Sequence, residues 1–231
     1  MYLVVLAAVL PALILLFYVY KKDKQPEPRL LLLKGAFLGV LSVFVSLLLS
    51  TPLGMVGLYE IVLSTWSDAI CTSFFGAAIP EELAKLFMLW LLLRKNRYFD
   101  EHMDGIVYAV AVSMGFAALE NVGYLLLNYD SWQSVGIVRA LVSVPAHYAF
   151  AVFMGYHYSL ACFGLPSEKT YHKVMVVVLP ILLHGVFDSL LFMMPLKENY
   201  AILLLVLFLV FCYYMHKYAA RRIKKHLVAV P

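Results

Sequence analysis

Seven long apolar runs constrain the fold of this chain more than any other feature of its sequence. Each run is long enough to cross a bilayer, which takes about 20 residues of α-helix. The runs cover roughly residues 2–20, 30–51, 73–93, 105–127, 136–163, 173–195 and 200–216. They predict an all-α, polytopic transmembrane helix bundle of about seven spans, and they leave too little chain for a separate soluble domain.

The composition agrees with a membrane protein. Hydrophobic residues make up 64% of the chain and charged residues 14%, whereas soluble domains have about 45–50% apolar and about 25% charged residues. The net charge of +4 does not indicate a nucleic-acid partner, because the Lys and Arg residues cluster at the ends of the apolar runs, where they face lipid headgroups. The lipid bilayer is the partner that this composition predicts.

The basic residues also predict the orientation. Most of the 18 Lys and Arg residues follow the first, third, fifth and seventh runs, whereas the connections between them contain only Lys197. Because positively charged loops stay in the cytoplasm, this alternation places the N-terminus outside and the C-terminus inside. The semi-polar stretch from Pro52 to Thr72 is expected to be an interfacial helix or an outward extension of the third span, since an eighth crossing there would spoil the alternation.

Polar side chains inside the apolar runs are the candidate functional residues. A charged residue in the middle of a membrane helix costs about 2.5–3.5 kcal/mol, so such residues usually face the bundle interior and serve a function. Counted at about 1.5 Å per residue from the cytoplasmic ends, the acidic residues and histidines lie roughly 16–24 Å deep. Four helices therefore place them at one level, which predicts a shared site. The candidates are Glu81, Glu82, Lys85, Glu120, Asn121, Arg139, His147, His184 and Asp188.

Each of these residues also has a structural interpretation. A buried pair such as Glu81 and Lys85 often only fixes helix contacts, and a lone buried histidine such as His147 is more often a packing residue than a ligand. Arg139 lies near the predicted outer interface, where its side chain would reach the lipid headgroups. Phe116 is expected to pack in the core. The shared depth, rather than any single residue, favours a functional site.

Spacing within the helices sharpens this prediction. His184 and Asp188 are four residues apart and share a helix face, so the carboxylate can orient the imidazole or join it on a metal. Glu81 and Glu82 are about 100° apart around their helix, so only one of them can face a given centre. A buried glutamate is a suitable general base for water.

These residues stand in a series of short motifs that resembles the PrsW family of bacterial membrane peptidases, within the superfamily of CAAX-type proteases and bacteriocin-processing enzymes. The resemblance covers most of the chain, and the order of the motifs is more specific than any one of them. The motifs are Tyr20–Pro28 with Asp23 and Glu27-Pro28, Glu81-Glu82-Leu83-Ala84-Lys85, the DGIVY stretch from Asp104, Phe116 with Glu120-Asn121, His147 after Pro145, and His184 with Asp188.

The resemblance implies an intramembrane protease of the bacterial cytoplasmic membrane. Residues 1–231 would form a single membrane-embedded peptidase domain with its catalytic spans at about 73–195. The implied substrate is a single-span membrane protein such as an anti-sigma factor, cut first (site 1) on the extracytoplasmic side during stress signalling.

Two mechanisms remain open from the sequence. In the metallopeptidase, zinc is held by His147, His184 and Asp188 or Glu120, and Glu81 or Glu82 activates the bound water. We favour this mechanism because two histidines and several carboxylates share one level, and we prefer Glu82 as the base.

The second mechanism needs no metal. A glutamate and a histidine activate water directly, while the amide of Asn121 stabilises the oxyanion. Two other classes of protein would use the same residues differently: a proton- or ion-coupled transporter, in which they relay protons, and a non-catalytic scaffold or immunity-type protein. The sequence shows no inverted repeat and no pair of broken helices of the kind that transporters have.

Overall fold

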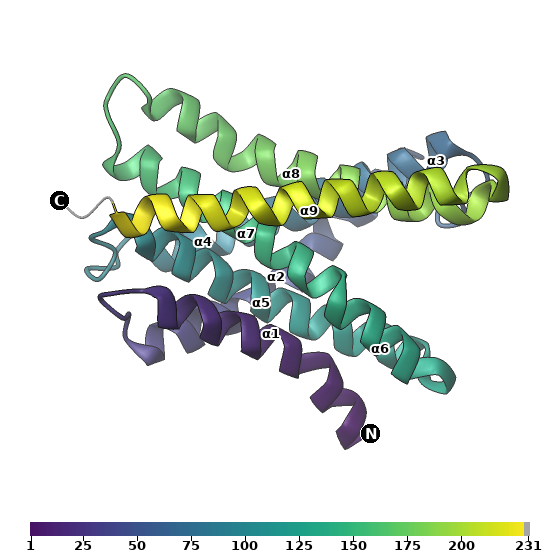
Figure 1. Ribbon diagram of the computed structural model, residues 1–231, viewed down its shortest axis with the longest axis horizontal. Helices are drawn as coiled ribbons and strands as arrows, with labels where there is room; N and C mark the ends of the chain where they lie inside the picture. Colours follow the sequence, from purple (N-terminus) through teal and green to yellow (C-terminus); the bar gives the residue numbers. More distant parts are fainter. Residues whose placement is uncertain (229–231) are drawn as a thin grey trace.

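The computed structural model describes residues 1–228 as a bundle of helices without strands in that range (Figure 1). The all-α prediction is therefore confirmed. The elements are α1 (Tyr2–Lys22), α2 (Arg29–Met55), α3 (Trp66–Cys71), the π-helix η1 (Thr72–Ala78), α4 (Ile79–Leu93), α5 (His102–Leu127), the short 3-10 helix η2 (Tyr129–Ser131), α6 (Trp132–Leu141), α7 (Ser143–Phe163), α8 (Lys169–Met193), the 3-10 helix η3 (Met194–Leu196) and α9 (Glu198–Val228).

Six helical segments of the described chain are long and apolar enough to cross a membrane. They are Tyr2–Lys22, Arg29–Met55, His102–Leu127, Tyr129–Phe163, Lys169–Leu196 and Glu198–Leu227. The remaining predicted span, residues 73–93, is not among these six and corresponds to η1 and α4. These two elements continue α3 without a break from Trp66 to Leu93.

The semi-polar stretch after α2 forms no membrane-spanning helix of its own. Helix α2 ends at Met55, and α3 begins only at Trp66, directly ahead of η1 and α4. Thr65 caps α3, because its side chain accepts a hydrogen bond from the Asp68 N–H and the Asp68 carboxylate accepts one from the Thr65 N–H. The end of this stretch therefore agrees with the second of the two alternatives from the sequence, an outward extension of the third span.

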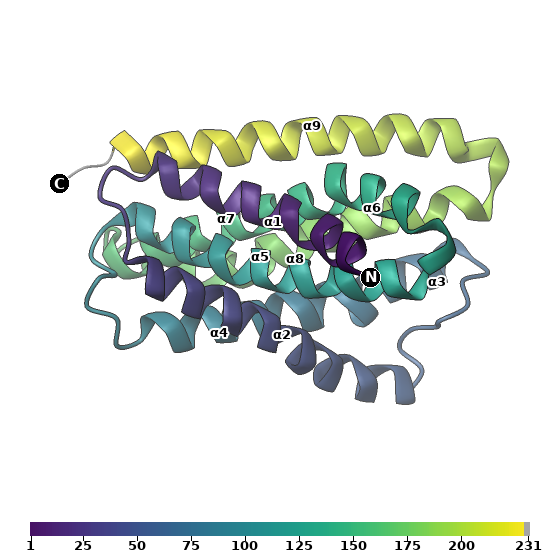
Figure 2. The same ribbon diagram turned by 90° about the horizontal axis from the view of Figure 1, so that it is seen from below.

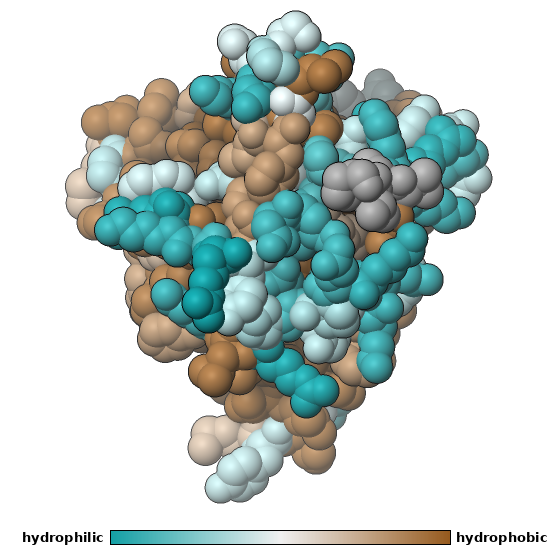
Figure 3. Space-filling model, turned by 90° about the vertical axis from the view of Figure 1, so that its left-hand side faces the viewer, coloured by the Kyte–Doolittle hydropathy of each residue, from teal (hydrophilic) through white to brown (hydrophobic). Residues whose placement is uncertain are grey.

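The ends of the bundle agree with the predicted orientation. Figures 1 and 2 show the α1–α2, α4–α5 and α7–α8 connections at the same end as the last turns of α9, whereas the N-terminus and the α8–α9 connection lie at the other end. Figure 3 shows that hydrophilic side chains gather on the first of these end faces. We refer to it as the cytoplasmic end.

Helix α5 is the centre of the bundle and packs against α1, α2, α4 and α7. Its residues from Met103 to Ala117 are buried on all sides, as expected for a helix that is apolar around its whole circumference. Glycines allow the close approach of its neighbours: a Cβ atom at Gly39 on α2 would lie 1.9 Å from the Val112 carbonyl oxygen, and one at Gly155 on α7 would lie 2.2 Å from the Gly105 oxygen.

The predicted fifth span is broken near its outer end. The backbone leaves the helical conformation at Val142 (φ −121°, ψ −64°), which separates α6 from α7. Pro145 lies in the first turn of α7, where a missing N–H and a fixed φ are tolerated. The break lets α6 pack against α5, α7 and α1 as a separate element.

Candidate active site

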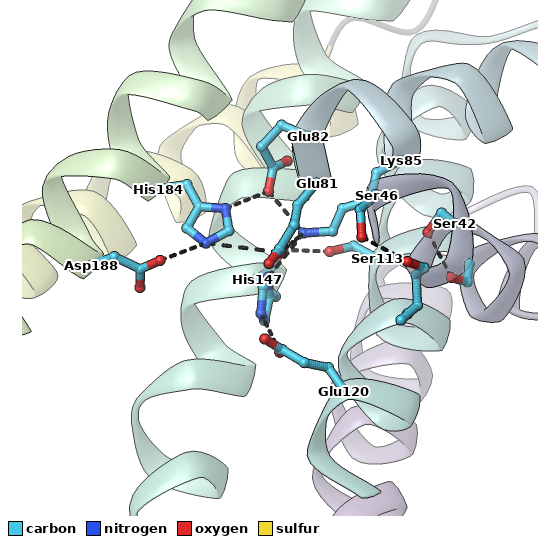
Figure 4. Close-up of polar contacts among 12 residues, drawn as sticks. Ser42, Ser46, Glu81, Glu82, Lys85, Ser113, Glu120, His147, His184 and Asp188 are labelled. Atoms are coloured by element: carbon cyan, nitrogen blue, oxygen red, sulfur yellow. Dashed lines mark hydrogen bonds and ion pairs between the residues drawn. The ribbon is translucent and has the colours of Figure 1, made fainter. Parts of the chain in front are cut away.

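Side chains from α4, α5, α7 and α8 meet in the interior of the bundle (Figure 4). The residues that share one predicted depth therefore also contact one another. Helix α4 contributes two glutamates and a lysine, α5 a glutamate, α7 a histidine, and α8 a histidine and an aspartate: Glu81, Glu82, Lys85, Glu120, His147, His184 and Asp188.

The π-helix η1 sets the position of the two α4 glutamates, which lie in the first turn of α4 directly after it. It packs closely on α8, because a Cβ atom at Gly185, next to His184, would lie 2.4 Å from the Phe74 ring. Single π-turns inside helices are frequent at functional sites. Here the π-helix and the missing Cβ together bring α4 within reach of α8.

Lys85 lies at the centre of the cluster. Its Nζ atom is 2.9 Å from Glu82 Oε1 and 3.2 Å from Glu81 Oε2, and it lies 3.9 Å above the centre of the Phe116 ring. Its side chain is almost completely buried. The buried ammonium group therefore pairs with both carboxylates, and Phe116 stabilises it through a cation–π contact.

His184 on α8 contacts Glu82 on α4 through one ring nitrogen and Asp188 on its own helix through the other. Its Nδ1 atom lies 2.9 Å from Glu82 Oε1, and its Nε2 atom lies 3.2 Å from Asp188 Oδ2. The ring of Phe150 stacks on the imidazole with the ring centres 4.8 Å apart. Because ionised carboxylates only accept hydrogen bonds, both ring nitrogens donate, and the imidazole is the charged imidazolium in this arrangement.

His147 is held between Lys85 and Glu120. Its Nδ1 atom is 3.2 Å from Lys85 Nζ, and its Nε2 atom is 3.0 Å from Glu120 Oε2. Its backbone carbonyl accepts a hydrogen bond from the Ser113 hydroxyl at 2.9 Å. These contacts fix both the ring and the backbone of His147.

Arg139 turns inward rather than reaching the lipid headgroups, which corrects the prediction from its depth. Its guanidinium donates to Glu120 Oε2 and to Asn121 Oδ1, both at 2.6 Å, and stacks 3.9 Å above the Tyr124 ring. The break before α7 makes this possible, because α6 folds against α5.

Asn121 does not line the cavity beside the other candidate residues, as an oxyanion donor would. Its amide nitrogen donates to the Ala8 carbonyl on α1 at 3.2 Å, while its oxygen accepts from Arg139. Both ends of the buried amide are therefore engaged in holding α1 and Arg139.

A cavity of about 150 Å³ opens beside the cluster. This is room for several waters. Glu81 lines the cavity, whereas Glu82 and Lys85 lie behind it, so the preference for Glu82 as the water-activating base is not supported by the geometry. The polar lining residues are Glu81, Glu120, Tyr124, Arg139, Ser143, His147, His184 and Asp188.

The donor set suits a metal ion. Glu81, Glu82, His147 and His184 each offer a ligand atom, and these atoms lie within 4.8 Å of one another. Two imidazole nitrogens and carboxylate oxygens are ligands that zinc accepts. The Lys85 ammonium contacts three of the same groups, so Lys85 and a metal would compete for them.

Asp188 and Glu120, which the sequence analysis considered as ligands, are not part of this group of four. Each contacts instead the Nε2 atom of a histidine, Asp188 that of His184 and Glu120 that of His147. Carboxylates placed in this way orient a ligand imidazole and leave its other nitrogen for the metal.

Four residues of the site are not predicted from the sequence: Ser113, Tyr124, Ser143 and Phe150. Tyr124 lies four residues after Glu120, and Phe150 lies three residues after His147, so helical spacing places both on the faces of known candidates. Ser113 carries no such signal, since small hydroxyl residues occur throughout membrane helices.

Comparison with known proteins agrees with this arrangement. The family "PrsW family intramembrane metalloprotease" matches residues 27–215. A curated Protease PrsW from Clostridioides difficile is 36% identical over 89% of this chain and 84% of its own length, one from Geobacillus kaustophilus 38% over 83% and 80%, and one from Bacillus subtilis 33% over 83% and 84%. No solved structure matches the chain. The chain therefore belongs to the PrsW family of intramembrane metalloproteases and is a multi-pass protease of the bacterial inner membrane.

Proposed function

We propose that this protease makes the first (site-1) cut in a single-span anti-sigma factor, on the extracytoplasmic side of the membrane. The observation that carries the proposal is the buried cavity lined by Glu81, His147 and His184, at a depth that the helix rise places between the midplane and the outer half of the bilayer. A peptide bond that enters from the outer side would meet water, a carboxylate and two imidazoles there.

Glu81 is the proposed general base. It lines the cavity, its side chain retains some exposure (14%), and Lys85 contacts it. A water in the cavity would donate a proton to Glu81 as it attacks the peptide carbonyl, and the same carboxyl would pass that proton to the leaving amine. Asp188 and Glu120 act as positioning residues, because they hold the rings of His184 and His147.

We propose zinc as the metal, held by the Nδ1 atoms of His147 and His184 together with Glu82. When bound, zinc supplies Lewis-acid polarisation of the carbonyl and makes water a stronger acid. Two observations support this proposal. The donor set contains imidazole and carboxylate ligands. Glu120 and Asp188 contact the Nε2 atoms of the two histidines, so both Nδ1 atoms face the glutamates and the lysine of α4.

The metal-free mechanism keeps Glu81 as the base and needs another oxyanion donor. Arg139 is the better candidate than Asn121, because its guanidinium lines the cavity and has five N–H groups. Metal analysis of the purified protein, with cleavage measured after chelation and after return of zinc, separates the mechanisms. Full cleavage in a metal-free sample would rule out zinc.

Co-expression with candidate single-span anti-sigma factors tests the function. Wild type and the exposed-carboxylate control Glu168→Gln should release the extracytoplasmic fragment, whereas Glu81→Gln and His184→Ala should leave the substrate intact. Cleavage by both site variants at the wild-type rate would place the reaction elsewhere. If wild type cuts other single-span proteins but no anti-sigma factor, the substrate assignment fails while the protease site stands.

A further inference from the structure

A second cluster of carboxylates lies at the cytoplasmic end of the bundle. Asp23 and Glu27 come from the α1–α2 connection and Asp104 from the first turn of α5, and one ligand oxygen from each lies within 4.8 Å of the others. All three are buried, with 6%, 5% and 0% exposure. Asp104 precedes Glu120 on the same helix by a distance of about 24 Å, so this acidic cluster is separate from the candidate active site.

Two oxygens of the acidic cluster have no hydrogen-bond partner within the described part of the chain. Asp104 Oδ2 accepts from the backbone N–H groups of Asp100 and Glu101 at 2.9 and 2.7 Å, but Oδ1 is buried and accepts nothing. Asp23 Oδ1 accepts from the Gln25 N–H at 3.0 Å, and its Oδ2 is likewise buried without a partner. Buried polar atoms almost always have partners, and an exception calls for an ion or a water.

The acidic cluster also lacks a positive charge. Within residues 1–228, no Lys, Arg or His nitrogen forms an ion pair with any of the three carboxylates. Lys24 is adjacent in sequence, but its ammonium donates to the Leu227 carbonyl on α9. The Tyr108 hydroxyl, which is uncharged, donates to Glu27 Oε2. Burying several carboxylates without a counter-charge is costly.

We propose that Asp23, Glu27 and Asp104 bind a hard divalent cation, Mg²⁺ or Ca²⁺, at the cytoplasmic end of the protein. Both ions take carboxylate oxygens at about 2.0–2.6 Å, and ligand oxygens within 4.8 Å of one another can share one such ion. The cluster contains no histidine or cysteine, so softer metals have no preferred ligand in it. The ion supplies the missing charge, and the unpartnered oxygens of Asp23 and Asp104 supply ligands together with a carboxylate oxygen of Glu27.

The cation would fix one end of α1 and the start of α5, two helices that contact the active site. It joins the α1–α2 connection to the start of α5, and α5 carries Glu120 and Asn121. The other end of α1 is also tied to the site, because the Ala8 carbonyl accepts a hydrogen bond from Asn121. The proposal does not depend on the substrate or on zinc, because it concerns a different group of ligands.

Mn²⁺ binding to the full-length protein in lipid nanodiscs, followed by electron paramagnetic resonance after a chelator wash, tests the site. Wild type should bind Mn²⁺ with displacement by Mg²⁺ or Ca²⁺, and the stronger competitor identifies the ion. Asp23→Asn and Glu27→Gln should weaken this binding at least about tenfold. Asp100→Asn, an exposed carboxylate beside the cluster, is the matched control, and His184→Ala separates this site from the active site. Both should bind as wild type does.

Proteolysis gives a second measurement that does not depend on activity. Trypsin cuts after Lys21 and Lys22 at the end of α1 and after Lys24 in the α1–α2 connection. Mg²⁺ or Ca²⁺ should slow this cutting in wild type and Asp100→Asn but not in Glu27→Gln. The proposal is overturned if wild type binds no Mn²⁺ below about 1 mM, or if Asp23→Asn and Glu27→Gln bind it as wild type does. Mn²⁺ binding by the wild-type protein can overturn the proposal even if a variant fails to fold.

Discussion

The Nζ atom of Lys85 lies 3.2 Å from Nδ1 of His147, and this contact assigns the tautomer of the imidazole. An ammonium group can only donate, so Nδ1 accepts. The proton is therefore on Nε2, which donates to Glu120 at 3.0 Å. His147 is thus neutral, with its lone pair directed toward Lys85 and the α4 glutamates, which is the state that a metal ligand requires.

Replacing Glu120 should disturb His147 without emptying the site. In Glu120→Gln the side chain can still accept a hydrogen bond, but it no longer carries the charge that holds Arg139 and the imidazole. Loss of a carboxylate that orients a ligand histidine typically costs about 10–100-fold in metal affinity or activity. We expect a decrease in kcat of that size with a smaller change in KM, measured with a purified substrate.

Exposed Glu168, on the cytoplasmic side of the same bundle, is the control for Glu120. Glu168→Gln should retain wild-type kcat. Equal kcat for Glu120→Gln and wild type would remove the positioning role of Glu120.

Glu81 and Glu82 should have separable roles. Glu81 lines the cavity, whereas Glu82 contacts His184 and Lys85 away from it. Glu81→Gln should lower kcat by about 100-fold or more and still retain zinc. Glu82→Gln should lose zinc as well as activity. Metal content and cleavage measured on the same samples check both outcomes, and the reverse pattern would exchange the base and the ligand.

Lys85 should determine the stability of the metal-free protein. In Lys85→Met, Glu81 loses its nearest counter-charge and Glu82 keeps only the His184 imidazolium. Removing one partner of a buried ion pair costs about 3–5 kcal/mol. We expect lower thermal stability without metal, and a larger stabilisation by added zinc than in wild type, because the ammonium no longer competes for the donors. Thermal unfolding with and without zinc measures both effects.

The matched control for Lys85 is Lys217→Met, at an exposed position on α9. It should unfold at the wild-type temperature in both conditions. If zinc stabilises Lys85→Met no more than wild type, Lys85 and the metal do not share ligands.

The sequence predicts the spans and the depth of the polar groups because both follow from local properties, hydropathy and the rise per residue. The contact between His184 and Asp188 is predictable for the same reason, since both lie on one helix. The choice between Glu81 and Glu82 is not, because it depends on how α4 is rotated against α8. That rotation follows from η1 and the close packing at Gly185, neither of which a periodicity argument detects.

Arg139 shows a second limit of the sequence. Its depth places it near the outer interface, and an unbroken fifth span would leave it there. The helix breaks at Val142, and α6 then packs on α5. Whether a chain breaks before a proline or continues through it depends on tertiary contacts, so the pairing of Arg139 with Glu120 needs the structure.

The packing of α2 on α5 gives a stability prediction. A Cβ atom at Gly39 would lie 1.9 Å from the Val112 carbonyl oxygen, whereas one at Gly123 meets nothing within 4 Å. Gly39→Ala should therefore lower the free energy of unfolding by about 1–3 kcal/mol or more, because the backbones must separate. Gly123→Ala, the matched control, should be neutral or slightly stabilising because alanine favours helix. Unfolding in mixed detergent micelles compares the two, and equal stability would contradict the close approach.

Zinc binding should release a proton from His184. With Nδ1 facing Glu82 and Nε2 facing Asp188, the metal-free imidazole carries both protons, and coordination through Nδ1 requires that one leave. Calorimetric titration of zinc into the metal-free protein, in two buffers that differ in ionisation enthalpy, should show release of about one proton, and affinity should rise with pH because protons compete for the ligand. Asp188→Asn, which removes the charge that stabilises the imidazolium, should release fewer protons. A binding heat independent of the buffer would show that His184 is already neutral before the metal arrives.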